Sequence, residues 1–374
     1  MAQQMKWLGA MDPRDSKLNL LLLAVPTTLY FNYFQHDSSM AFASSLVAIM
    51  PLAFLMGRAT EEIALRTSES LGGLLNATFG NAAEMIIALL LIYSAYQNKG
   101  TDTEFFYLQL VQASIIGSIL GNLLLVMGLA FVWGGIHFTE QKFSKTQVSS
   151  NGSLLLLSMI VLIVPTVFQS TVGGESGEEG VRNLSRIAAV ILLLIYCLFL
   201  FFQFRSHEHL FATEGSHHEE PEMSQRDAII LLVVATILVS WMAEILVHSV
   251  EEAADKLELP HIFIGVILLP LFGNAAEHFT AVTVAGKDKM DLSFAISMGS
   301  STQIAVFVAP MMVIFAWGLG VPLTFEFGMI ETVSAFLSVL IVNSIAADGK
   351  SNWLEGAMLL ASYAVLGAAF LFHP

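Results

Sequence analysis

Long apolar stretches recur along almost the whole chain, and they restrict its fold more than any other feature. The 374 residues are 55% hydrophobic and only 13% charged. A water-soluble globule of this size cannot bury so much apolar surface. The sequence therefore predicts that the lipid bilayer is the main solvent and that the chain is a multi-pass integral membrane protein.

Eleven of these stretches are long enough to cross a membrane as helices, since a bilayer core takes about 20 apolar residues. The first ends in bulky Tyr33 and Phe34 and is followed by further spans, so we expect a retained helix and not a signal peptide. The prediction is an all-α polytopic membrane protein with eleven transmembrane helices. The predicted spans lie near residues 18–34, 39–65, 71–96, 105–133, 148–169, 184–204, 227–253, 260–285, 291–317, 323–346 and 353–373.

The distribution of basic residues predicts the orientation, because translocated loops tend to lack Lys and Arg. With the N-terminus in the cytoplasm, 12 of the 16 Lys and Arg residues fall on the cytoplasmic side. If the count omitted one span early in the chain, every later loop would change sides and this bias would be weaker. The bias therefore supports eleven helices independently of hydropathy.

A motif of Phe-Gly-Asn-Ala-Ala-Glu occurs twice, at residues 79–84 and 272–277, and each copy follows a stretch that ends in a Glu-Glu pair. Five spans lie in each half of the chain, and because five is odd, the second copy enters the membrane inverted. Such inverted repeats usually place a substrate site between them near the bilayer midplane. The predicted parts are an N-terminal tail with the first helix (1–38), the first five-helix repeat (39–204), a linker (205–226) and the second, inverted repeat (227–374).

The linker is rich in Glu and His, and we predict that it lies in the cytoplasm. It is either a solvated connector or a regulatory sensor of cations or protons.

Other features of the sequence exclude several kinds of site. The single cysteine, Cys197, allows no internal disulfide and no Cys-based zinc cluster. No basic patch for nucleic acid and no phosphate-binding loop for ATP is present.

Each motif places one carboxylate inside an apolar helix, whereas nearly all basic residues lie near span ends. An ionised carboxylate in a membrane is costly and usually acts on ions or protons. The motif glycine, one turn earlier, allows local unwinding that frees a backbone carbonyl, and the asparagine adds an amide oxygen. Hard oxygen ligands of this kind favour calcium. The predicted metal site consists of Glu84, Glu277, Gly80, Gly273, Asn81 and Asn274.

Two neighbouring carboxylates also predict proton binding, because they cannot both stay charged without a counter-charge. One calcium ion or two protons neutralise the pair equally, and a neutral site crosses a low-dielectric barrier most easily. The chemistry thus predicts a secondary active antiporter that exports cytosolic calcium in exchange for protons by alternating access. No cofactor and no enzymatic activity is expected.

The third helix of each repeat is predicted to line the ion path. Hydroxyl groups in membrane helices often bond back to the backbone instead, so Asn122 and Gln303 are the stronger candidates. His278, next to Glu277, is either a packed, hydrogen-bonded histidine, which we prefer, or a proton relay. The path-lining candidates are Ser114, Ser118, Asn122, Ser300 and Gln303.

These motifs resemble the calcium/proton antiporter family of the calcium/cation exchanger superfamily. The resemblance covers nearly the whole chain, and it implies that Glu84 and Glu277 carry calcium and protons, with Asn81 and Asn274 beside them. It also implies that the linker is the acidic segment between the halves. The resemblance rests on Gly72-Gly-Leu-Leu-Asn-Ala-Thr-Phe-Gly-Asn-Ala-Ala-Glu84, Gln112-Ala-Ser-Ile-Ile-Gly-Ser118, Leu269-Pro-Leu-Phe-Gly-Asn-Ala-Ala-Glu277 and Gly299-Ser-Ser-Thr-Gln303.

Two alternatives stay open. In a sodium-coupled calcium exchanger, hydroxyl residues and a proline would stand at Asn81 and Ala83, and an acidic residue near Gln303. A cation channel is disfavoured because pores usually use rings from identical subunits. The short N-terminal tail and the lack of a sorting segment suggest a prokaryotic cell membrane. The sequence does not predict the oligomeric state.

Overall fold

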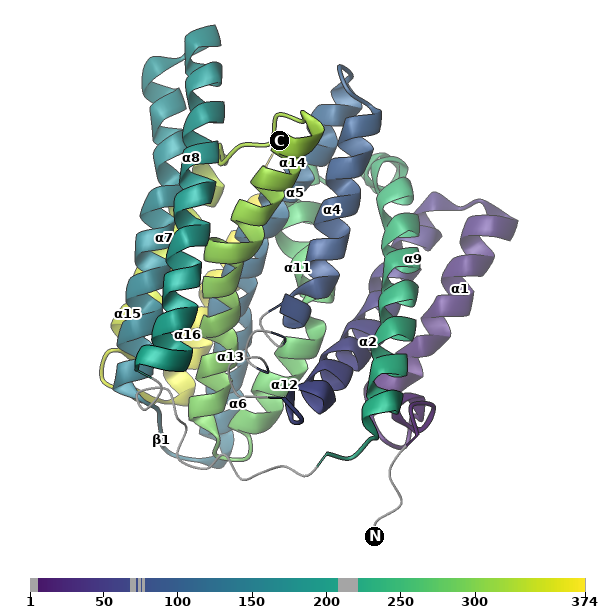
Figure 1. Ribbon diagram of the computed structural model, residues 1–374, viewed down its shortest axis with the longest axis vertical. Coiled ribbons are helices and arrows are strands. Elements are labelled where there is room, and N and C mark those ends of the chain that lie inside the picture. Colours follow the sequence, from purple (N-terminus) through teal and green to yellow (C-terminus); the bar gives the residue numbers. More distant parts are fainter. Residues whose placement is uncertain (1–5, 68–71, 73–74, 76–77, 208–220, 374) are drawn as a thin grey trace. The chain divides into compact units, whose positions relative to one another are not determined.

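The computed structural model describes residues 6–67, 72, 75, 78–207 and 221–373, and helices make up most of them (Figure 1). The chain forms two compact units. Both units draw on the two halves of the sequence, so they are a different division from the predicted repeats. The boundaries of the repeats therefore stay a prediction. Unit 1 comprises Met1–Leu90, Ala212–Leu259 and Leu271–Ala276, and unit 2 comprises Leu91–Phe211, Pro260–Pro270 and Glu277–Pro374.

Unit 1 contains two long helices and the N-terminal helical segments. Three further helices carry the chain between the units: α4 (Ala82–Gln97), α11 (Leu269–Gly273) and α12 (Ala275–Ala285). The first predicted span is helical, but 3-10, α and π turns follow one another in it. The elements of unit 1 alone are η1 (Gly9–Met11), η2 (Lys17–Leu23), α1 (Ala24–Tyr30), η3 (Phe31–Gln35), α2 (Ser38–Ala64) and α9 (Gln225–Leu257).

Helices α2 and α9 pack against each other and run in opposite directions. Ser38, at the start of α2, donates a hydrogen bond to Glu252, near the end of α9. At the other end, Met223 precedes α9 and donates its N–H to Glu62 of α2. Small residues let the backbones of membrane helices approach closely. On α2 the buried small residues are Ala41, Ser45, Ala48, Ala53 and Ala59.

Unit 2 holds the remaining helices and two short strands. The strands pair antiparallel, Gln141 with Ser351 and Lys142 with Lys350. Helix α16 starts with a capping box, in which Asn352 and Glu355 bond each other's backbone N–H groups. The elements are α5 (Asp102–Leu120), η4 (Gly121–Val126), α6 (Met127–His137), β1 (Gln141–Lys142), α7 (Lys145–Val172), α8 (Gly174–Phe201), η5 (Phe202–Ser206), α10 (His261–Phe263), η7 (Ile264–Leu268), α13 (Met290–Gln303), η8 (Ile304–Val308), α14 (Ala309–Leu319), α15 (Met329–Ala346), β2 (Lys350–Ser351) and α16 (Trp353–Leu371).

Eight helices among the described residues are long and apolar enough to cross a membrane. A ninth candidate is the pair His261–Gly273 and Ala275–Ala285, which bends by 59° at its break. The predicted span 71–96 lies partly outside the described residues, and its described helix α4 is shorter than the others. The prediction of a helical, multi-pass membrane protein is confirmed. The count of eleven spans and the inverted repeat stay predictions.

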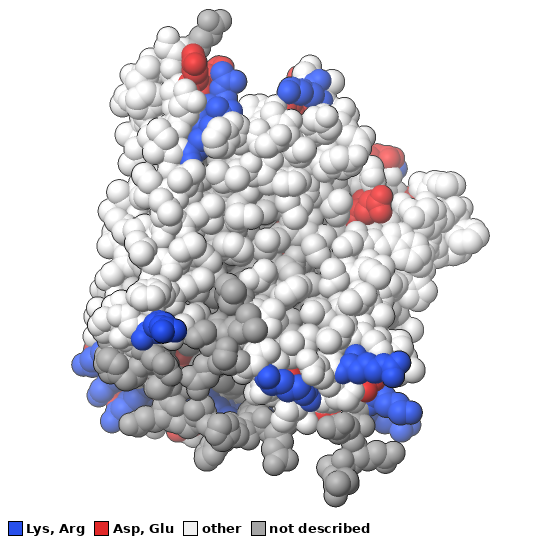
Figure 2. All heavy atoms as spheres, in the orientation of Figure 1, with Lys and Arg blue, Asp and Glu red and all other residues white. Residues whose placement is uncertain are grey.

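Helix α8 carries a stripe of exposed apolar side chains spaced three or four residues apart. A stripe of this size is unfavourable in water but suits a surface that faces lipid tails. Figure 2 shows charged side chains toward the ends of the helices and a largely uncharged surface between them. The exposed stripe consists of Ile187, Ile191, Leu194, Leu198 and Phe201.

The connection between α14 and α15 is irregular but well held. Gln112 of α5 donates a hydrogen bond to the carbonyl of Thr324 (2.9 Å). Thr166 of α7 donates to the carbonyl of Phe325 (3.2 Å), and Ser185 of α8 accepts from the N–H of Phe325 (2.9 Å). Side chains from three helices thus supply hydrogen-bond partners for backbone groups that have no helix or sheet partners. Its alternate residues Val321, Leu323, Phe325 and Phe327 are buried.

Candidate cation site

The first motif lies where a helix is interrupted. Residues 78–80 are helical, Asn81 forms a turn, and α4 begins at Ala82. The side chain of Asn81 is buried, and its carbonyl accepts a hydrogen bond from the N–H of Met85 at 3.0 Å. Glu84 stands in the first turn of α4. The interruption falls one residue after Gly80, where the sequence predicts unwinding.

The second motif has the same local structure. Helix α11 ends at Gly273, Asn274 forms a turn, and α12 begins at Ala275. Asn274 is only 2% exposed, and Glu277 stands in the first turn of α12. In both motifs the carboxylate therefore sits three residues after the interrupted turn, at the start of a new helix.

Within unit 1 the two motifs meet. The side-chain amide nitrogen of Asn274, from the second motif, donates a hydrogen bond to Oε1 of Glu84, from the first. A Cβ placed on Gly273 would lie 3.5 Å from Cγ of Glu84, in ordinary van der Waals contact. The structure thus brings together three of the six predicted site residues. Glu277 belongs to unit 2, and the convergence of the two carboxylates stays a prediction.

The hydrogen bond from Asn274 has a chemical consequence for Glu84. A neutral amide that donates to a carboxylate forms a charge-assisted bond, which is shorter and stronger than one between neutral groups. The bond holds the Glu84 carboxylate in one orientation without adding a charge. A carboxylate held in one orientation is a hard oxygen ligand that suits a divalent cation such as calcium, or a proton.

In unit 2, the third helices of the two predicted repeats pack together, because α13 contacts both α5 and η4. Ser118, Asn122 and Ser300 are buried, and Gln303 is the last residue of α13. The hydroxyl of Ser114 donates to a carbonyl of its own helix at 2.9 Å. Hydroxyl groups in membrane helices often bond back to the backbone in this way.

Asn122 is the most telling of the path-lining candidates. It is 1% exposed, and neither atom of its side-chain amide has a hydrogen-bond partner within the part of the chain that the structure describes. Buried amides are nearly always paired, so this group is suited to an ion, a water or a moving partner.

Two π-helical segments accompany these polar residues. Asn122 stands in η4, and η8 starts directly after Gln303. Turns of this kind frequently occur at functional sites. No pattern in the sequence predicts them, since hydropathy does not distinguish π from α turns.

His278 agrees only in part with the preferred reading of a packed, hydrogen-bonded histidine. The side chain is buried, at 8% exposure. Its Nε2 atom, however, has no hydrogen-bond partner among the described residues.

A close crossing of backbones holds α5 in place. A Cβ on Gly117 would lie 2.2 Å from the carbonyl oxygen of Val266 in η7, and one on Gly265 would lie 2.4 Å from Cβ of Ala113. Gly121 has nothing within 4 Å of such an atom. Gly117 and Gly121 have the Gly-x-x-x-Gly spacing that is typical of closely packed membrane helices. Of the two, only Gly117 lies at a close helix contact.

Interrupted membrane helices with polar residues at the breaks define a multi-pass protein of the kind found among secondary transporters. The chain belongs to the sodium/calcium exchanger protein family, whose model matches residues 38–205 and 228–372. A Ca2+/H+ antiporter of Aphanothece halophytica is 44% identical over 369 residues, covering 95% of this chain and 96% of the relative. A Ca2+/H+ antiporter of Synechocystis is 42% identical over 377 residues, covering 96% and 98%.

Solved structures agree with this family. The structure of native YfkE superposes with a TM-score of 0.80 at 36% identity, covering 95% of this chain and 100% of that one. The crystal structure of the H+/Ca2+ exchanger CAX shares the fold, with a TM-score of 0.70 at 14% identity over 95% of this chain and 92% of that one. The resemblance to calcium/proton antiporters is thus confirmed. The cytoplasmic N-terminus and the prokaryotic cell membrane stay predictions.

Proposed function

We propose that this protein is a secondary active antiporter that moves calcium out of the cytosol in exchange for protons, with Glu84 and Glu277 as the carriers. The observation that carries the proposal is the hydrogen bond from Asn274 to Glu84, which joins residues of the two motifs. The names of the relatives, two Ca2+/H+ antiporters, support the choice of ions.

The mechanism follows from charge balance. One calcium ion or two protons neutralise two carboxylates, whereas an empty, doubly charged site is costly to move through a low-dielectric region. Only the neutral, occupied site then changes its accessibility between the two sides of the membrane. Calcium and protons must therefore take turns, and the site needs no nucleotide.

Transport by the unmodified chain tests the proposal against its rivals. Purified protein in sealed liposomes with an acidic interior should take up external calcium, and dissipating the pH gradient should stop the uptake. Uptake that follows a sodium gradient at equal pH on both sides would establish the sodium-coupled alternative. Calcium entry that needs neither gradient and continues without a counter-ion would establish a channel.

Protons and calcium should also compete at equilibrium. If calcium displaces two protons from the carboxylate pair, its apparent affinity falls by up to about 100-fold per unit decrease in pH below the pair's apparent pKa values. Calcium binding measured by titration calorimetry across a pH series checks this. An affinity that does not change with pH in that range would contradict the shared site.

Asn274 should matter through its hydrogen bond and not through its size. Replacing it by Leu, which has a similar volume, removes the donor and should weaken calcium transport by about 10- to 100-fold, since a hydrogen bond to a charged group contributes about 1.5–3 kcal/mol. The measurement is the initial rate of proton-driven uptake at subsaturating calcium. A rate equal to that of the parent would show that the bond does not orient Glu84. Asn98→Leu is the matched control, because the side-chain amide of Asn98, outside the candidate site, donates its hydrogen bond to the carbonyl of Ser94, four residues earlier.

A further inference from the structure

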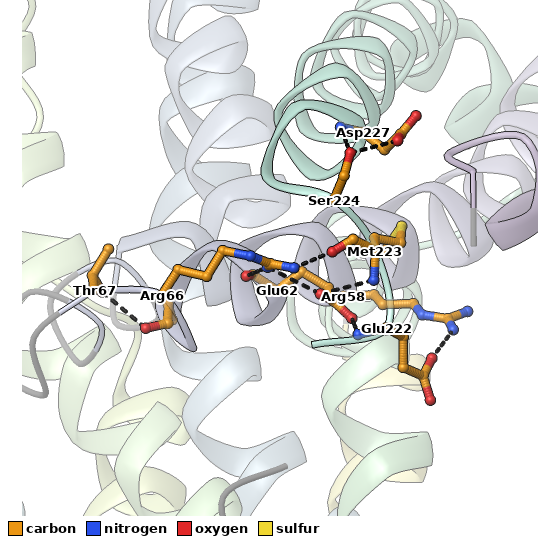
Figure 3. A network of polar contacts seen from close by, with 9 residues as sticks. Arg58, Glu62, Arg66, Thr67, Glu222, Met223, Ser224 and Asp227 are labelled. Atoms are coloured by element: carbon orange, nitrogen blue, oxygen red, sulfur yellow. Dashed lines mark hydrogen bonds and ion pairs between the residues drawn. The ribbon is translucent and has the colours of Figure 1, made fainter. Parts of the chain in front are cut away.

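A polar network at the end of α2 has no part in the site described above (Figure 3). Its centre is Glu62, a carboxylate with only 7% of its side-chain surface exposed. It is the second residue of a Glu-Glu pair, and from the sequence alone such a pair near a span end is either a solvated helix end or a group that attracts cations into the entrance. Its burial shows that it is not solvated.

The Glu62 carboxylate binds a stretch of backbone. Oε1 accepts the N–H of Glu222 at 2.9 Å, and Oε2 accepts the N–H of Met223 at 3.2 Å. Arg66 completes the grip, because its guanidinium pairs with Oε2 of Glu62 at 3.2 Å and donates to the carbonyl of Met223. The pair Glu62 and Arg66 thus binds the N–H groups of Glu222 and Met223 and the carbonyl of Met223.

The fastened residues lie directly before a long helix. The side chain of Met223 is fully buried. The next residue, Ser224, caps α9 by accepting the N–H of Asp227 at 3.1 Å and donating to its carboxylate at 2.6 Å. Whatever holds Met223 therefore also sets where α9 begins.

A second contact ties the N-terminal segment to the same place. Arg58, one turn earlier on α2, pairs with Glu222 at 2.8 Å and with Asp15. The end of α2 thus gathers the N-terminal segment and the end of the linker.

The other Glu-Glu pair offers a natural comparison. Glu252 pairs with Lys256 four residues later, just as Glu62 pairs with Arg66, and it accepts a hydrogen bond from Ser38 at the start of α2. The two acids therefore join opposite ends of the antiparallel helices α2 and α9. They differ in burial, since 57% of the side-chain surface of Glu252 is exposed.

From these contacts we infer that Glu62 and Arg66 form a latch, a pair of positioning residues that fastens the end of the linker to α2. The latch fixes the start of α9 and the end of α2. It acts on the rate of exchange without touching the transported ion. The inference goes beyond the proposed function. Of its two tests, only the transport measurement rests on the proposed function.

Opening of the latch can be measured directly, because Cys197 is the single cysteine of the chain. In a Cys197→Ser background, a cysteine introduced by Met223→Cys is buried while the latch is closed. Adding Glu62→Gln should speed its reaction with a membrane-impermeant maleimide by about 10- to 100-fold, since a hydrogen bond to a charged group is lost. Glu252→Gln, the exposed counterpart, should leave this rate unchanged. Equal rates with and without Glu62→Gln would overturn the latch.

Transport separates positioning from cation attraction. A latch predicts that Glu62→Gln and Arg66→Gln both lower the maximal rate of calcium uptake and leave the apparent KM for calcium unchanged. Attraction of cations predicts opposite effects of these two variants on KM, because they remove opposite charges. Opposite KM shifts with an unchanged maximal rate would therefore overturn the inference.

A third variant covers the case in which neither Glu62→Gln nor Arg66→Gln folds. Arg58→Gln keeps both Glu62 and Arg66 and should speed the maleimide reaction by a smaller factor. An unchanged rate in this variant would count against the latch. If the unmodified chain moves no calcium, the proposed function fails, while the maleimide reaction still decides the latch.

Discussion

Glu84→Gln and Glu277→Gln should each reduce proton-driven calcium uptake to about 1% of the parent rate or less. Each change removes a carboxylate charge that binds the transported ions, which costs more than the loss of a single hydrogen bond. Glutamine keeps the size of the side chain and its ability to accept a hydrogen bond from Asn274. It loses both the negative charge that balances calcium and the group that carries a proton. Each variant should therefore lose the binding of calcium and the binding of a proton together.

The measurement is calcium uptake into liposomes with an imposed pH gradient, beside calcium binding by calorimetry. Glu140→Gln is the matched control, because Glu140 is an exposed acid whose partner is Lys350. It should transport at close to the parent rate. Proton-driven uptake near the parent rate in either of the two glutamine variants would refute the paired-carboxylate site.

Gly117→Ala and Gly121→Ala should change stability in opposite directions, although the two glycines lie one turn apart. A Cβ at Gly117 would meet the backbone of Val266 at 2.2 Å, which the helices can relieve only by moving apart. Overpacking of this kind costs about 1–3 kcal/mol and sometimes more. At Gly121 the space is open, and alanine should stabilise the helix by about 0.5–1 kcal/mol, as expected from helix propensity.

Thermal unfolding of the detergent-solubilised protein, followed by circular dichroism, checks this pair of variants. The midpoint for Gly117→Ala should fall below that of the parent, and the midpoint for Gly121→Ala should rise above it. Equal midpoints for the two variants would mean that α5 and η7 are not in backbone contact.

The sequence predicts the parts of this protein that depend on residue type. The length of the apolar stretches predicts the helices, and the repeated motif predicts that Glu84 and Asn274 belong to one site, as their hydrogen bond supports. It also predicts a weak point in each motif helix, but it places the break at glycine, whereas the break occurs at Asn81 and Asn274. An asparagine tolerates a turn as well, because its side chain competes with the backbone for hydrogen bonds.

Other features depend on which backbones meet, and residue type alone does not predict them. Gly117 and Gly121 have the same spacing signal, but only Gly117 faces another helix. Glu62 reads as a solvated acid at a helix end, because its partners are backbone groups that lie far away in the chain. Such pairings arise from tertiary packing, which a local pattern does not encode.

The irregular connection between α14 and α15 matters for protein engineering. Its backbone is bound by Gln112, Thr166 and Ser185, so it ties three helices together besides joining two. A fluorescent reporter or epitope inserted at Phe325 would break these bonds at once. The turn at Gly173 between α7 and α8 is exposed and has nothing within 4 Å of an added Cβ, so a foreign sequence should be accommodated there.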